Sequence, residues 1–166
     1  SPLSTEAAPP SNDNLANAQT IAGASGSVAA TTVEATIEQS ESTHSGGPLT
    51  RVYNTVWFQI TPAESKPVTL TADSAAFDAS MAVYTGSNFP LDAVNVNNDT
   101  NGTNPRVEFF GVAGTTYRIV IGIYDQPAQA GGVFTLSWQE TDAPSNDNFA
   151  QAHNLNGQRG SLAITN

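Results

Sequence analysis

Oxygen-bearing side chains gather in two stretches near the start of the chain. Asp13 stands between Asn12 and Asn14, and Glu38 and Glu41 follow after a run rich in Val, Thr and Ala. Calcium takes about six to eight oxygen ligands, mostly carboxylates and carbonyls. The pattern therefore predicts a calcium site that uses Asp13, Asn14, Glu38 and Glu41. The alternative is that Asp13 caps a helical turn and the glutamates are solvated.

A second oxygen-rich stretch, residues 97–102, reads NNDTNG and adds Asp99 to the candidate calcium ligands. It lacks the spacing of an EF-hand loop, which ends in a glutamate. Runs of Asn, Asp and Gly are also what tight β-turns require. We expect a turn here, with Asp99 as a further candidate ligand.

Catalytic residues are sparse. His44 has serines close by at Ser42 and Ser45, but the chain contains no Gly-x-Ser-x-Gly phrase of the kind that places a hydrolase nucleophile. Paired carboxylates of the glycosidase type depend on spatial separation, which a sequence does not give. A loop histidine is more often polar surface than catalyst. We expect a protein that is not an enzyme.

The composition excludes several classes of partner. The chain has 15 acidic and 5 basic residues and a net charge of -10. Too few cations are present to neutralise a row of phosphates or to bind an anionic membrane surface, so we expect no nucleic-acid partner. The apolar runs are too short to span a bilayer, so we expect no membrane insertion. With 0 cysteines, disulfides and thiolate metal sites are excluded.

The two ends of the chain repeat each other. Residues 10–32 read PSNDNLANAQTIAGASGSVAATT, and residues 144–166 read PSNDNFAQAHNLNGQRGSLAITN, with 12 of 23 aligned positions identical. Such a duplication is typical of a tandem array. We therefore expect a linker over 1–9, a complete repeat over 10–141, and the opening of a second repeat, or a connector between subunits, over 142–166. The candidate assembly residues in this last segment are Asn146, Asp147, Phe149, Leu155, Leu162 and Ile164.

Between the repeats, short runs with a period of two alternate with Gly, Pro, Asn and Asp. About eight strands are expected, in residues 27–37, 56–60, 68–72, 81–84, 94–96, 107–109, 117–123 and 134–138. This spacing predicts an all-β fold, a two-sheet antiparallel β-sandwich that is jelly-roll-like in outline. One short helix is expected over residues 14–19, capped by Asn12 or Asp13.

Several phrases, in order along the chain, resemble the bacterial pre-peptidase C-terminal domain family and the related collagen-binding domains of clostridial collagenases. They are NDNLANA at 12–18, ATIEQSESTH at 35–44, TVWFQITP at 55–62, FDASMAVYTG at 77–86, the turn at 97–99, and AGTTYRIVI at 113–121. The resemblance implies a β-sandwich accessory module of a secreted or surface protein. It also implies calcium binding, with Asp13, Glu38 and Glu41 in the calcium-linked part.

Two functions follow as expectations. The first is a non-catalytic, calcium-stabilised repeat of a secreted or cell-surface bacterial protein or fibre, structural or adhesive, whose partners are neighbouring copies of the same module. The second is an accessory module of a secreted hydrolase that binds polysaccharide or an extracellular-matrix protein such as collagen. In that case exposed aromatic side chains would stack on the ligand. The candidates are Tyr53, Trp57, Tyr84, Phe89 and Tyr124.

Overall fold

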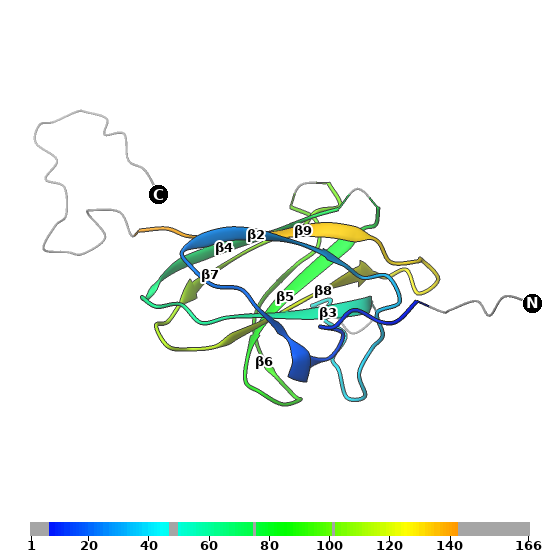
Figure 1. Ribbon diagram of the computed structural model, residues 1–166, viewed down its shortest axis with the longest axis horizontal. Coiled ribbons are helices and arrows are strands. Elements are labelled where there is room, and N and C mark those ends of the chain that lie inside the picture. Colours follow the sequence, from blue (N-terminus) through cyan, green and yellow to red (C-terminus); the bar gives the residue numbers. More distant parts are fainter. Residues whose placement is uncertain (1–6, 47–49, 75, 101, 143–166) are drawn as a thin grey trace, which may run out of the picture.

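The computed structural model describes residues 7–46, 50–74, 76–100 and 102–142. Within these ranges the chain forms nine strands and one short 3-10 helix (Figure 1). In chain order the elements are η1 (Leu15–Asn17), β1 (Gln19–Thr20), β2 (Ser25–Thr31), β3 (Val52–Ile60), β4 (Lys66–Asp73), β5 (Ala79–Thr85), β6 (Asp92–Asn97), β7 (Arg106–Gly111), β8 (Tyr117–Tyr124) and β9 (Val133–Glu140). No helix in the described ranges has the length and apolar character needed to cross a membrane.

The strands form two sheets that face each other. One has five strands in the order β1-β3-β8-β5-β6, and the other has four in the order β2-β9-β4-β7. All pairings are antiparallel except that of β1 with β3. From β2 onward the chain crosses between the sheets at every connection except β5 to β6, which is the winding of a jelly roll. The predicted fold class is confirmed.

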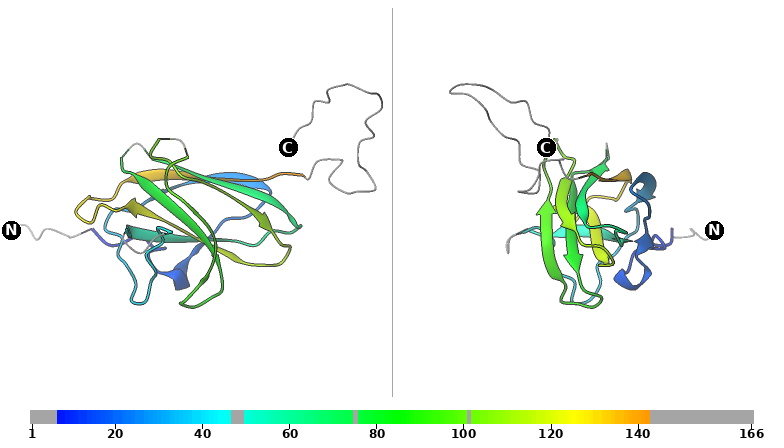
Figure 2. Two further views of the ribbon diagram at one scale, coloured as in Figure 1. Left: turned by 180° about the vertical axis from the view of Figure 1, so that it is seen from behind. Right: turned by 90° about the vertical axis from the view of Figure 1, so that its left-hand side faces the viewer.

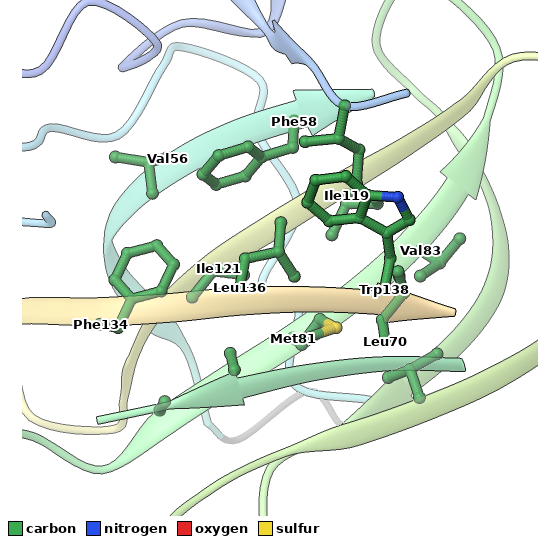
Figure 3. Packing of buried hydrophobic residues seen from close by; sticks show 14 of the residues in the cluster. Val56, Phe58, Leu70, Met81, Val83, Ile119, Ile121, Phe134, Leu136 and Trp138 are labelled. Carbon is green, nitrogen blue, oxygen red and sulfur yellow. The ribbon is translucent and has the colours of Figure 1, made fainter. Parts of the chain in front are cut away.

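The main core fills the space between the sheets, as Figure 3 shows. Alternate residues of β3 point into it, so Val56, Phe58 and Ile60 have exposures of 0%, 0% and 1%. In the four-stranded sheet, β9 contributes Phe134, Leu136 and Trp138 by the same alternation. The period-two pattern of the sequence therefore places these side chains correctly.

Two expected elements differ from the structure, and one strand was not expected. The strand expected over residues 27–37 is β2, which ends at Thr31, because a turn follows in which the Ala35 amide donates to the Thr32 carbonyl. The expected helix is only the three-residue η1; its N-cap is Asn14, which makes no side-chain capping bond. The additional strand is β1, which has two residues.

Two segments lie on the outer side of the five-stranded sheet. In Figures 1 and 2 the segment before β1, in dark blue, and the loop between β2 and β3, in cyan, lie on the side of this sheet that faces away from the other one. They cover a face that the sandwich alone would leave in solvent, and they carry Asp13, Asn14, Glu38, Glu41 and His44.

Candidate functional site

The outer face of the five-stranded sheet carries a second apolar cluster. Trp57, Ala82 and Val120 lie side by side on β3, β5 and β8, and each has an exposure of 1% or less. Leu15 of η1 packs on them and is 5% exposed. Because Trp57 points away from the main core, its burial depends on the two covering segments and on Phe89 of the β5–β6 loop, whose ring centroid lies 5.9 Å from that of Trp57.

The N-terminal segment is attached through Asn12 and Asp13. The Asn12 side-chain amide donates to the Trp57 carbonyl at 2.9 Å, and the Asn12 carbonyl accepts from the Trp57 amide at 2.8 Å. The Asp13 carboxylate accepts from the backbone amide and the hydroxyl of Thr36 at 2.6 and 2.7 Å. These bonds join the segment to the sheet and to the β2–β3 loop.

The β2–β3 loop is organised around the carboxylate of Glu41, whose side chain is 0% exposed. Its two oxygens accept from the Glu38 amide at 2.7 Å and from Nε2 of His44 at 2.9 Å. The Glu38 carboxylate in turn accepts from the Leu15 amide at 2.6 Å. One chain of hydrogen bonds thus runs from η1 through Glu38 and Glu41 to His44.

His44 connects this chain to the sheet. Because a carboxylate only accepts hydrogen bonds, Nε2 of His44 carries a proton and donates to Glu41. In a neutral ring Nδ1 is then the acceptor. The Tyr84 hydroxyl lies 2.7 Å from Nδ1 and donates to it when the ring is neutral. The ring also packs edge-on against Trp57 and Tyr84, with centroids 5.4 Å apart in both pairs. Burial raises the pKa of Tyr84, the Ser42 hydroxyl opposes this, and the Glu41 charge adds to it.

Ser42, His44 and Glu41 together have the composition of a hydrolase triad. Ser42 is exposed, and its Oγ lies 3.0 Å from Nδ1 of His44. It borders a depression of about 420 Å³ that Tyr84 and Asn95 also line. However, a neutral imidazole has one accepting nitrogen, and the Tyr84 hydroxyl is the nearer donor to it. Tyr84 therefore competes with Ser42 for Nδ1, and this geometry favours a hydrogen-bonded link at His44 over a triad.

The predicted calcium ligands fall into two places. Asp13, Asn14, Glu38 and Glu41 come together in this region, but their carboxylates face protein donors. Both oxygens of Asp13 and both of Glu41 accept hydrogen bonds. Across the described ranges no group of three or more His, Asp or Glu side chains is arranged to hold a metal ion. This arrangement does not fit a calcium ion, and calcium stays a prediction.

Asp99 lies elsewhere, in the β6–β7 turn, where its carboxylate accepts from the Asn98 side chain at 2.7 Å. The charge of Asp99 acts on a second carboxylate, that of Asp78, which lies just before β5. Burial raises the pKa of Asp78, and the charge of Asp99 raises it further. Asp99 is therefore a turn residue beside a second carboxylate, and it is not joined to the region around Glu41.

The five candidate aromatic side chains do not form an exposed strip. Trp57 and Tyr84 are buried at 0% and 6% exposure, and Tyr53, Phe89 and Tyr124 are half-buried. The six candidate assembly residues between Asn146 and Ile164 lie outside the described residues, so the structure leaves their role as a prediction.

Sequence reasoning missed that His44, Tyr84 and Trp57 form a common cluster. A usable signal was present in β5 and β8, which read ASMAVYT and YRIVIGIY and lack a polar face. A strand that is apolar on both sides is covered on both sides. The second cover, here the β2–β3 loop and η1, could have been sought on that ground.

Fold and site together define a jelly-roll β-sandwich module in which the N-terminal segment and the β2–β3 loop form an extra layer on one sheet. Hydrogen bonds between polar side chains and the backbone hold this layer in place. No family model matches the chain, and no curated protein matches it either. Among solved structures it is similar to the pre-peptidase C-terminal domain of Bacillus anthracis collagenase, with a TM-score of 0.50 and 15% identity over 74% of this chain and 94% of that domain. The fold of this chain is that of a pre-peptidase C-terminal domain, so the resemblance predicted from the sequence is confirmed at the level of the fold.

Two further solved structures are less similar. One is the Aeromonas hydrophila protein PliG, a periplasmic inhibitor of g-type lysozyme, with a TM-score of 0.48 and 13% identity over 75% of this chain and 96% of PliG. The other is CorA, a surface-associated copper-binding protein of Methylomicrobium album BG8, with a TM-score of 0.48 and 9% identity over 75% of this chain and 98% of CorA.

Proposed function

We propose that this chain is a non-catalytic extracellular β-sandwich repeat with a structural or adhesive role in a bacterial surface protein or fibre. The observation that carries the proposal is the duplication of a segment on which the module depends. Residues 10–32 supply η1 and β1, which cover and extend one sheet, and β2, an edge strand of the other. Residues 144–166 repeat this segment. The partners we propose are therefore neighbouring copies of the same module.

The positions of the chain ends support a head-to-tail arrangement. The described chain enters the sandwich at one end, in dark blue, and β9 leaves it at the opposite end, in orange (Figures 1 and 2). A second module that begins with residues 144–166 would therefore follow the first along its long axis. Such a line of modules is the usual geometry of tandem repeats.

The hydrogen-bonded cluster between the β2–β3 loop and the sheet supports a role without catalysis. Glu41, His44 and Tyr84 use their hydrogen-bonding groups on one another and on the backbone. Buried polar networks that are satisfied in this way hold segments in place. We infer that this cluster fixes the loop to the sheet, so that a thin extracellular module without disulfides keeps its second layer.

The test compares the full chain with a chain that ends at Asp142. This truncation removes no described element, so both should fold. Light scattering and electron microscopy, each with calcium and with chelator, should show oligomers or filaments for the full chain and monomers for the truncated one. Two monomers of equal stability would overturn the structural role. The accessory-module alternative would then be measured directly, by pull-down on insoluble polysaccharide and on collagen.

A further inference from the structure

The contacts of the first copy of the repeat explain which positions the second copy keeps. Asn12 exchanges two hydrogen bonds with the backbone of Trp57, and Asp13 accepts two from Thr36. The equivalent residues 146 and 147 are again Asn and Asp. Surface positions of a linker have no need of these two side chains in this order. The second copy therefore keeps the polar groups that attach the first copy to the sheet.

The apolar anchors are kept in kind. Leu15 and Ile21 are 5% and 3% exposed, one in the outer cluster and the other in the main core. At the equivalent positions the second copy has Phe149 and Leu155. It thus carries the apolar side chains needed to occupy both clusters.

Glycine provides the most specific match. A Cβ at Gly26 would lie 2.3 Å from the ring of Trp138, so no larger residue fits between β2 and this side chain. Gly23 has a φ of +88°, and its carbonyl accepts from the Trp138 indole at 3.1 Å. The second copy has glycine at both equivalent positions, 157 and 160. Both glycines that the contact with Trp138 requires are therefore present in the second copy.

The second copy cannot take this position in its own chain. β2 pairs with β9 from Ser25 beside Gln139 to Thr31 beside Val133, and Asp13 is bonded to Thr36, just beyond that far end. The nine steps from Val133 to Asp142 cover about 30 Å of extended chain. The five steps from residue 142 to residue 147 reach at most about 17 Å. The Trp138 that the second copy fits is therefore not the one in its own module.

We propose that residues 144–166 of one molecule occupy, in a neighbouring molecule of the same protein, the position that residues 10–32 hold in the described structure. This inference rests on the proposed head-to-tail function and specifies the contact that connects one molecule to the next. The incoming segment adds the edge strand beside β9 and the cover over Trp57, and the displaced segment of the acceptor is its near-equivalent. The exchange therefore replaces each contact with a similar one.

Engineered cysteines test this pairing, since the chain has none of its own. Ala29 pairs with Thr135 on the exposed side of the β2–β9 ladder, and Ala163 is the residue equivalent to Ala29. Paired Cα atoms of neighbouring strands lie within disulfide range. Full chains that combine Thr135→Cys with Ala163→Cys should form a reducible ladder of dimers and longer species. The control, Thr135→Cys with Ala29→Cys, should form a bond within one chain.

A second pair of variants uses the glycine. Gly160→Val should abolish assembly of the full chain, because the added side chain would collide with Trp138 of the acceptor, and it should leave the melting temperature unchanged. Ser161→Val is the matched control, since the equivalent Ser27 is exposed, and it should assemble like the parent chain.

The exchange would be overturned if the full chain assembles but no intermolecular disulfide forms, and if Gly160→Val also assembles. The proposed function would then still stand. Absence of both assembly and disulfide would overturn both proposals.

Discussion

Replacing Glu41 by glutamine tests whether the buried polar network holds the second layer on the sheet. The substitution keeps the shape of the side chain but changes one of its two oxygens into an NH2 group. In the structure both oxygens accept, one from the Glu38 amide at 2.7 Å and one from His44 at 2.9 Å. If the new amide group faces Glu38, two donors meet. If it faces His44, the ring must move its proton from Nε2 to Nδ1, so that the Tyr84 hydroxyl can no longer donate there.

The size of the effect follows from the replacement of two hydrogen bonds to a charged group by weaker neutral ones, and from the donor pair or change of tautomer that the new amide imposes. Together these cost about 2–3 kcal/mol. For a module of this length that corresponds to a fall in melting temperature of about 10 °C. The fall should be accompanied by increased accessibility of Trp57, because the loop that covers it is released.

The assay is urea and thermal unfolding of the full chain followed by far-UV circular dichroism, with acrylamide quenching of tryptophan fluorescence for the loop. Glu34→Gln is the matched control, since Glu34 is exposed in the same loop and should change stability by less than about 0.5 kcal/mol. If Glu41→Gln and Glu34→Gln unfold at the same urea concentration, the network does not hold the loop and the reasoning fails.

Two other predictions concern charged groups. If the segment around Asp13 binds calcium, the melting temperature of the full chain should be higher in calcium than in chelator, and Asp13→Asn should remove that difference; identical curves in both conditions would contradict calcium binding. Burial, and secondly Asp99, raise the pKa of Asp78, so the folded chain holds this proton more tightly than the unfolded chain and loses stability as pH rises through the folded pKa. Asp78→Asn should therefore be more stable than the parent chain at pH 7 and equal to it well below the ordinary value of 3.8, as measured by urea midpoints; a less stable variant at pH 7 would show that the charge of Asp78 is favourable.

The sequence alone determined the sandwich and its main core. In β3 and β9 side chains alternate between core and surface, so the period of two identified Phe58 and Leu136 as core residues without further information. The duplication of residues 10–32 was likewise visible by comparing the chain with itself. These features are local or repetitive, and a linear pattern records them fully.

Only the tertiary structure decided what Glu41, His44 and Tyr84 do. Their contacts join residues 40 positions apart, and nothing in the spacing of a loop histidine and a strand tyrosine predicts a 2.7 Å hydrogen bond. The same is true of Asp13, whose carboxylate accepts from Thr36, 23 positions away. Carboxylates are attracted to metal ions and to backbone amides alike, and which of these they meet is set by how the covering segments fold over the sheet.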